Sequence, residues 1–163
     1  MLGYLLRTVP VAVRARVRQD GRLISRLRRR VALQHVDLNL HMNQAAYAEV
    51  MELGRTDWLL RSGAWSRWRA AGSYPVVAEQ RIIYRRELKP LEAYVLDTRA
   101  VALYGRFLVF DHYMLVGNQV HTHNQIKLIF VGSDKVVGAD AVSVLCRGLV
   151  TEPLQIEDWR VIS

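Results

Sequence analysis

The sequence has few of the features that mark disulfide-rich, zinc-binding or membrane-spanning proteins. Its 163 residues include a single cysteine, Cys146. A lone thiol cannot form an internal disulfide or supply a zinc cluster, and the apolar neighbours of Cys146 favour a buried hydrophobic residue over a nucleophile. This cysteine usage is typical of the cytoplasm, where we place the protein. No run reaches the roughly 18 apolar residues that a bilayer-spanning helix needs, so we expect a soluble chain.

Nucleotide and metal motifs are also missing. The sequence has no P-loop and no G-x-G-x-x-G pattern, so nothing indicates a nucleotide-binding fold. His121 and His123 share one face of a predicted strand, as metal ligands can, but no third ligand with zinc-like spacing accompanies them. We therefore interpret both histidines as solvated or interfacial, and we expect no metal and no separate cofactor.

Acidic residues are almost absent from the first part of the chain. Residues 1–30 contain nine arginines and one acid, Asp20, whereas the rest of the chain is neutral, so the net charge of +8 belongs to this segment. A neutral body argues against a nucleic-acid-binding face spread over the domain. We expect a basic arm at 1–24, a folded domain at 25–150 and a tail at 151–163. The alternation from Val13 to Arg18 predicts that the arm, where ordered, is a strand that could contact phosphates or an anionic membrane.

The spacing of apolar residues changes from period two to period 3.6 near residue 44. The alternating segment from Leu27 to His35 predicts a strand. Residues 44–61 carry one apolar stripe and predict a helix, for which Asn43 is a suitable N-cap. Gly54, in the middle of this helix, costs about 1 kcal/mol relative to alanine, which indicates a close neighbour.

The rest of the chain is typical of strands. A polar connection with Trp65 and Trp68 precedes them, and turn residues then recur every 12 to 15 positions. This spacing predicts an antiparallel meander over 76–86, 94–103, 106–116 and 120–131, followed by a short helix at 140–147. One amphipathic helix and one sheet can each bury a face against the other. We therefore expect an α+β fold with a five- or six-stranded antiparallel sheet around the long helix.

The loop before the long helix carries the residues with the clearest chemistry. Asp37 lies seven positions before Gln44, the first residue of the predicted helix. First-turn amides have no partner within the helix, and the helix dipole adds partial positive charge there. Such an end can polarise a carbonyl whose oxygen gains charge in the transition state. A carboxylate beside it makes a minimal thioester hydrolase, in which one group attacks or activates water and the other stabilises the oxyanion.

The residues Asp-Leu-Asn-Leu-His-Met-Asn-Gln-Ala-Ala-Tyr (37–47), followed by Glu-Leu-Gly-Arg (52–55), resemble a known signature. It is the D-x-x-x-H-M-N-N-x-x-Y…(D/E)-x-x-R pattern of the 4-hydroxybenzoyl-CoA thioesterase-like hotdog proteins. The element order fits this family to about Val137. The resemblance implies a hotdog fold and hydrolysis of an acyl-CoA thioester. It also implies a homodimer or a dimer of dimers, joined at sheet edges, with sites at the subunit boundary.

The resemblance assigns roles to the loop residues. Asp37 falls on the catalytic aspartate, which acts as nucleophile or general base. The backbone amide of Gln44 falls where the thioester carbonyl is polarised, and His41 and Asn43 fall on residues that shape the turn. Leu40 stands where many members have glycine. From the residues alone, Asp37 could instead cap its turn.

Further candidates lie on the helix and the strands. Tyr47 and Glu52 fall on helix positions near the subunit interface. In some hotdog thioesterases a helix carboxylate is the catalytic group, so Glu52, or else Glu49, is the second candidate. Basic residues of the predicted strands could contact the phosphates of CoA, and these are Arg81, Arg85, Arg86, Lys89 and Arg106.

The sequence thus predicts an acyl-CoA thioesterase acting on a fatty or aromatic acyl group. One alternative is a non-catalytic module on the same fold that binds acyl-CoA or an acyl carrier. Another is a protein that docks on nucleic acid or membrane through its basic arm, and a third, weaker one is a hotdog dehydratase. Ligand binding without thiol release would indicate the first, and steeply salt-dependent binding the second.

Overall fold

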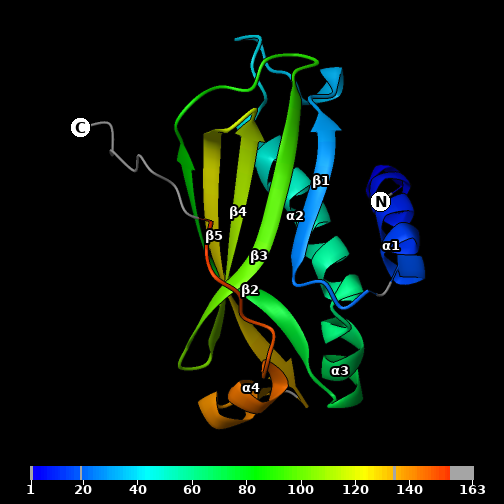
Figure 1. Cartoon of the computed structure of the whole chain (residues 1–163), viewed down its shortest axis with the longest axis vertical. Coiled ribbons are helices and arrows are strands. Elements are labelled where there is room, and N and C mark those ends of the chain that lie inside the picture. Colours follow the sequence, from blue (N-terminus) through cyan, green and yellow to red (C-terminus); the bar gives the residue numbers. More distant parts are fainter. Residues whose placement is uncertain (1, 19, 134, 155–163) are drawn as a thin grey trace.

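The described part of the chain forms a six-stranded antiparallel sheet that curls around one long helix (Figure 1). In this computed structural model the described residues are 2–18, 20–133 and 135–154. The strands are β1 (Ile24–Arg30), β2 (Tyr74–Tyr84), β3 (Ala93–Tyr104), β4 (Phe107–Val116), β5 (Gln119–Gly132) and β6 (Lys135–Val136). The helices are α1 (Leu2–Arg18), α2 (Gln44–Arg61), α3 (Ala64–Ala70) and α4 (Ala139–Leu145), with a 3-10 turn at Leu33–His35. The end of the predicted tail, residues 155–163, lies outside the described residues.

The long helix is confirmed residue for residue. The Asn43 side chain accepts a hydrogen bond from the Ala45 amide at 2.9 Å, as its predicted N-cap role requires. After the C-cap Ser62, Gly63 has a φ of +75°, which turns the chain out of the helix. Two clusters of buried side chains join α2 to the sheet, one around Met51 and the other around Trp58.

The sheet order differs from the predicted meander in one place. The order is β1-β3-β4-β5-β2, with β6 paired to β5, so the consecutive strands β3, β4, β5 and β6 pair with one another in turn, whereas β1 and β2 do not pair with each other. The meander prediction was wrong for β2, which pairs with β5 and not with β3. Both edges of β3 are occupied, by β1 and by β4. The chain after β2 therefore crosses the end of the sheet through residues 85–92 before β3 begins.

The strand predicted at Val13 to Arg18 was wrong, because these residues belong to α1. A period-two pattern also repeats every four residues, which is close to one helical turn. Val11 and Ala15 are four apart and are both buried, and α1 packs on α2. The helical form is thus the one in which the alternating residues bury an apolar face. Among the described residues, no helix combines the length and apolarity needed to span a bilayer.

The predicted polar connection at Trp65 and Trp68 was also wrong, because it contains helix α3. Trp68 is fully buried, and its indole donates a hydrogen bond to the Leu145 carbonyl at 3.0 Å. α3 therefore closes one end of the core together with α4 (Figure 1). The helix predicted at 140–147 is confirmed as α4, which begins and ends one to two residues earlier.

Candidate active site

Asp37 closes its own loop in front of α2. Its Oδ1 accepts hydrogen bonds from the Asn39 amide at 2.9 Å and from the His41 amide at 3.4 Å. Its backbone N–H donates to the His41 carbonyl at 2.9 Å, and its carbonyl accepts from Leu40 at 3.1 Å. The carboxylate is thus held by the loop through one oxygen. Within the described residues, its other oxygen, Oδ2, has no partner and is the one available to a reactant.

Leu40 occupies the left-handed region in this loop, with a φ of +60°. This conformation is where glycine has no steric penalty, which explains why the resembling family favours glycine at the position. The Leu40 side chain is 68% exposed and lines neither pocket described below. The cost of Leu40 is therefore backbone strain, of about 1–2 kcal/mol, and not obstruction of the site.

The first turn of α2 presents one amide to the same region. The Asn43 side chain accepts a hydrogen bond from the backbone N–H of Ala45, and the Asn43 carbonyl accepts one from the N–H of Ala46 at 3.0 Å. In the part of the chain that the structure describes, the backbone N–H of Gln44 has no partner. Because the N–H groups of Ala45 and Ala46 already donate to Asn43, the Gln44 N–H is the remaining donor of the first turn, and the helix dipole favours negative charge beside it.

Asp37 and Gln44 line one pocket, here called the Asp37 pocket, with a volume of about 490 Å³. His41, Tyr47, Arg85 and Arg86 of the predicted set line it as well. The other lining residues are Met42, Tyr84 and Glu87. The structure thus brings together six predicted site residues from the loop, the helix and the residues after β2.

Two phenols form the side of this pocket nearest the sheet. The rings of Tyr47 and Tyr84 meet edge to face, with centroids 5.0 Å apart. Burial raises the pKa of both hydroxyls, so both stay protonated at neutral pH. The Gln44 side chain lies near the Tyr84 hydroxyl and partly opposes the rise in its pKa, and His41 Nε2 lies 3.4 Å from a Glu87 carboxylate oxygen. Helix and strand are therefore linked across the pocket.

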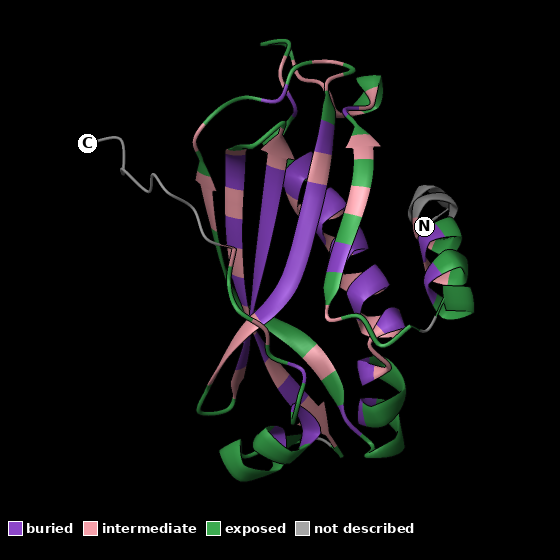
Figure 2. Cartoon of the chain, viewed as in Figure 1, coloured by how far each residue is buried: buried purple, intermediate pink, exposed green. Residues whose placement is uncertain are grey.

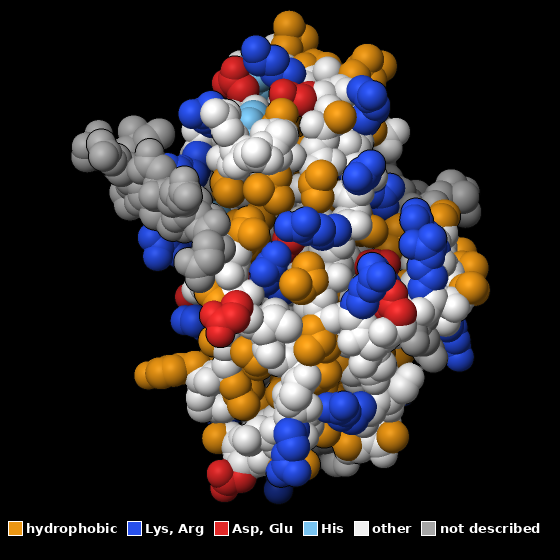
Figure 3. All heavy atoms as spheres, viewed as in Figure 1, with side chains coloured by type: hydrophobic (Ala, Val, Ile, Leu, Met, Phe, Trp, Pro, Cys, Tyr) orange, Lys and Arg blue, Asp and Glu red, His pale blue; other side chains and the backbone are white. Residues whose placement is uncertain are grey.

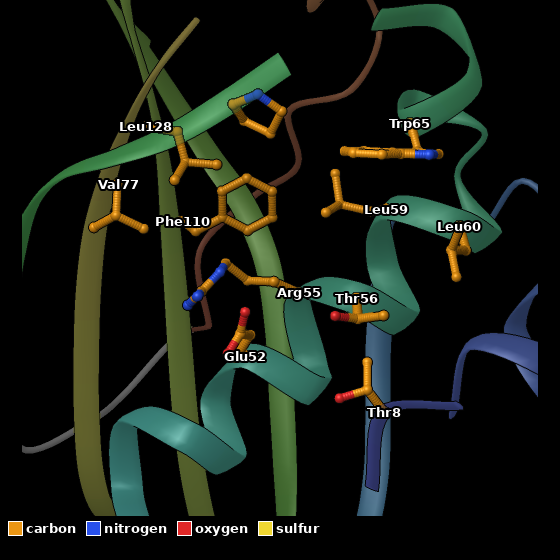
Figure 4. A pocket seen from close by; sticks show the side chains of 11 residues that line it. Thr8, Glu52, Arg55, Thr56, Leu59, Leu60, Trp65, Val77, Phe110 and Leu128 are labelled. Atoms are coloured by element: carbon orange, nitrogen blue, oxygen red, sulfur yellow. The ribbon is translucent and has the colours of Figure 1, made fainter. Parts of the chain in front are cut away.

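Glu52 lies in a different pocket, here called the Glu52 pocket, with a volume of about 360 Å³. Figure 4 shows the Glu52 carboxylate and the Arg55 guanidinium pointing toward one another, with Phe110, Leu128 and Val77 on the sheet side. The remaining lining residues are Thr8, Thr56, Leu59, Leu60, Trp65 and Pro75. Apart from the polar groups contributed by α1 and α2, this pocket is apolar.

Both pockets lie along the seam between α2 and β2. The Asp37 pocket is lined by Tyr47 of α2 and Tyr84 of β2. The Glu52 pocket is lined by Glu52 of α2 and Val77 of β2. Helix and strand therefore run together from one pocket to the other. In the sheet between them, Asn124 of β5 is fully buried, and its side-chain amide has no partner among the described residues.

The other predicted residues lie elsewhere. Asn43 is exposed in the loop next to the Asp37 pocket but is not among its lining residues. Arg81 is exposed on β2, opposite Gln125 of β5. Arg106 lies in the turn between β3 and β4, at the end of the sheet opposite to Tyr84. The structure does not bring these two arginines to Asp37.

The two histidines singled out as possible metal ligands have protein neighbours. His121 Nδ1 lies 3.0 Å from the Glu87 carbonyl, and His123 Nε2 lies 3.0 Å from Asp111 Oδ1. The rings of His123 and Tyr113 stack with centroids 4.7 Å apart. Within the described residues, no group of three or more histidine, cysteine or acidic side chains converges as metal ligands would.

Sequence reasoning missed Tyr84, Glu87 and the residues around Glu52. Tyr84 ends β2, and its place beside Tyr47 depends on β2 crossing to the far edge of the sheet. The meander that the turns predicted puts β2 at the other edge. The alternating apolar pattern of the strands shows which residues face α2, but the register is needed to tell which of them meet.

Solved structures share this fold at low sequence identity. The probable thioesterase YbaW from Escherichia coli is 20% identical, with a TM-score of 0.72, and the match covers 78% of this chain and 99% of that one. A thioesterase from Thermus thermophilus, complexed with coenzyme A and zinc, is 23% identical, with a TM-score of 0.64 over 80% of this chain and 96% of the other. The DHNA-CoA thioesterase from Staphylococcus aureus is 18% identical, with a TM-score of 0.60 over 72% and 82%.

A long helix inside a curled antiparallel sheet, shared with these structures, defines a hotdog protein. The family model of the thioesterase-like superfamily matches residues 31–149, which is well over half of the chain. The chain therefore belongs to the thioesterase-like superfamily. The matched segment contains the Asp37 loop, α2 and every strand of the described sheet except β1, which ends just before residue 31.

Proposed function

We propose that this protein hydrolyses an acyl-CoA thioester in the Asp37 pocket. The observation that carries the proposal is the pairing of two groups in one cavity. The Asp37 carboxylate is oriented by two loop amides and keeps Oδ2 available, and the Gln44 amide is the uncapped donor of the helix. Carboxylate and oxyanion donor are the two groups that thioester hydrolysis requires.

The chemistry follows from these positions. The thioester carbonyl oxygen accepts the Gln44 N–H, which stabilises the negative charge that develops on it. Asp37 either attacks the carbonyl carbon, giving a mixed anhydride that water then hydrolyses, or takes a proton from the water that attacks. In both routes the C–S bond breaks, the thiolate of CoA leaves and takes up a proton, and the free acid forms.

The two ends of the substrate have different surroundings. Arg85 and Arg86 line the Asp37 pocket and can contact CoA phosphates, because guanidinium groups bind phosphate oxygens through paired N–H donors. The acyl group is placed along the seam toward the Glu52 pocket, where Phe110, Leu128 and Val77 provide apolar surface. This surface fits a fatty or an aromatic acyl group.

A homodimer would complete the site. β2 ends the described sheet at one edge, and four of its large apolar residues are exposed: Tyr74 at 43%, Val76 at 39%, Val77 at 44% and Tyr84 at 42%. Two copies that pair β2 about a two-fold axis run antiparallel, so the Tyr84 end of one strand meets the Tyr74 end of the other. The Asp37 pocket of one protomer then adjoins the Glu52 pocket of its partner. Sedimentation equilibrium tests this, and a monomer would contradict it.

The deciding experiment measures release of free CoA from short, long and aromatic acyl-CoAs. Asp37→Asn should lower kcat by two or more orders of magnitude, since a general base or nucleophile is lost. Asp140→Asn, which removes the same charge from the exposed start of α4, is the matched control and should keep wild-type turnover. Activity that survives Asp37→Asn and disappears in Glu52→Gln would move the catalytic role to the helix. Tight binding without any turnover would indicate a binding module, in which Asp37 only caps its loop.

A further inference from the structure

Helix α1 has two apolar faces, and α2 covers one of them. Val11 and Ala15 are 8% and 0% exposed on the side that packs against α2. On the opposite side, Val9, Val13 and Val17 are 49%, 57% and 82% exposed. Figure 2 shows this division, with buried residues toward α2 and exposed residues away from it. Residues four apart lie on one helix face, so the three exposed valines form a continuous outer stripe.

Arginines border this stripe. Arg14, Arg16 and Arg18 are exposed, and on a helical projection Arg16 lies on one side of the valines and Arg14 on the other. The chain then continues into β1, where Arg26, Arg28 and Arg30 are exposed. Figure 3 shows several basic side chains on the side of the molecule where Figure 1 places β1 and α1, and others spread over the rest of this face.

No acidic residue occurs before Asp20, and the nine arginines of residues 1–30, less the one negative charge of Asp20, account for the entire net charge of +8. We propose that α1 docks this protein on an anionic lipid surface. The valine stripe enters the boundary between headgroups and acyl chains, and the flanking guanidiniums bind lipid phosphates. An amphipathic helix with an exposed apolar stripe and a basic border has the composition that such binding requires. Among the described residues, none from α1 lines the Asp37 pocket, so docking through the valine stripe leaves that pocket open.

Two other occupants fit the surface less well. A second copy of the chain, packed stripe to stripe about a two-fold axis, would bring the same arginines of both copies together, and like charges repel. A nucleic acid would use the arginines but would leave three exposed valines unused. Only a lipid surface engages both the apolar stripe and its basic border.

The test is co-sedimentation of the full chain with vesicles of phosphatidylcholine alone or mixed with phosphatidylglycerol. Binding should require the anionic lipid and weaken as salt is added, because the phosphate contacts are screened. Val13→Glu with Val17→Glu should lower the partition coefficient about tenfold or more, since the apolar stripe is lost. Arg14→Gln with Arg16→Gln should lower it by a similar factor.

The matched control is Lys135→Gln with Arg147→Gln, which removes two exposed positive charges away from α1. This variant should bind within about twofold of wild type, because the effect depends on position and not on net charge. All altered side chains are exposed, and circular dichroism checks that the variants stay folded. Equal binding to neutral and anionic vesicles would overturn the proposal.

Two further results would also overturn the proposal, and each identifies another occupant. Self-association of the wild type that disappears in the valine variant would assign the stripe to contacts between copies. Retention on DNA that falls in the arginine variant but not in the valine variant would assign the arm to nucleic acid. Loss of thioesterase activity with vesicle binding intact would concern the Asp37 pocket alone, so the two proposals are tested separately.

Discussion

Gly54 of α2 lies directly against Thr98 of β3. A Cβ atom placed on Gly54 would be 2.2 Å from Thr98 Oγ1 and 3.0 Å from Leu96 Cδ2. Real Cβ atoms do not approach other atoms so closely, so the absence of a side chain at Gly54 sets the distance between helix and sheet. The seam that contains both pockets depends on this distance.

Gly54→Ala should therefore destabilise the fold by about 1–3 kcal/mol, although alanine is the better helix former by about 1 kcal/mol. Urea unfolding measures the change. Thr98→Ala removes the nearest atom, so the double variant should be more stable than the sum of the two single effects by about 1 kcal/mol. Strict additivity would show that the contact with Thr98 is not the cause.

Leu40→Gly should stabilise the protein. The φ of +60° costs a leucine about 1–2 kcal/mol, and glycine removes this strain. Against this gain, glycine destabilises the fold by about 0.4–1 kcal/mol, because it raises the conformational entropy of the unfolded chain. A net gain of about 0.5–1 kcal/mol is expected in chemical denaturation. Leu38→Gly, in the same loop and fully exposed but without a positive φ, is the control and should be neutral or destabilising. If both variants behave alike, strain at Leu40 is not the reason.

Asp20 connects the chain after α1 to the end of α2. Its Oδ1 accepts from Arg61 Nε at 3.1 Å, and this guanidinium lowers the pKa of the Asp20 carboxyl from 3.8 to about 2. Because the folded pKa is the lower one, the pair stabilises the protein above about pH 3.8, and this contribution is lost as the pH falls through about 2. Asp20→Asn should lower the Tm at neutral pH, and the difference should disappear near pH 2. A Tm difference between the two proteins that stays constant with pH would show that the Asp20–Arg61 ion pair is not its cause.

Asn124 is fully buried, and its side-chain amide has no hydrogen-bond partner in the described residues. An unsatisfied buried amide costs about 1–3 kcal/mol, so Asn124→Leu should stabilise the fold by about 1 kcal/mol or more. Thr98→Val is the contrasting variant, because Thr98 Oγ1 lies 2.9 Å from His112 Nδ1 and its loss leaves the imidazole without that contact. This variant should destabilise by about 1 kcal/mol. Loss of stability in Asn124→Leu would show that the amide has a partner.

Cys146 is 3% exposed, and burial raises the pKa of its thiol to about 12. The thiolate is the reactive form, so the folded protein should not react with Ellman's reagent at mildly alkaline pH. One thiol per chain should appear once a denaturant is added. Rapid reaction of the folded protein would show that the thiol is accessible and would reopen a nucleophilic role.

Several features followed from local residue patterns alone. α2 could be predicted from Asn43 to Arg61, because its cap and its apolar stripe lie within 19 consecutive residues. Gly54 indicated a close neighbour because nothing else explains glycine in mid-helix. The spacing of Asp37 and Gln44 indicated a carboxylate near a helix end, and both line one pocket.

The errors came from patterns that two structures satisfy equally. Val13 to Arg18 alternate, and this suits either a strand or a helix with two apolar faces. Packing of Val11 and Ala15 on α2 decided in favour of the helix. The composition of the turn after β2 does not show whether the next strand pairs with β2 or lies elsewhere in the sheet. In the structure β3 pairs with β1 and β4, which leaves no free edge of β3 for β2.

The sequence by itself determined α2, the strands after it and the position of the Asp37 loop before α2, because caps, turns and periodicities act over a few residues. Only the tertiary structure decided that Tyr84 meets Tyr47, that Glu52 lies in a separate pocket, and that one valine stripe of α1 stays uncovered. These relations join residues far apart in the chain. They depend on strand order and helix packing, which are set by which surfaces exclude water together and not by any local pattern.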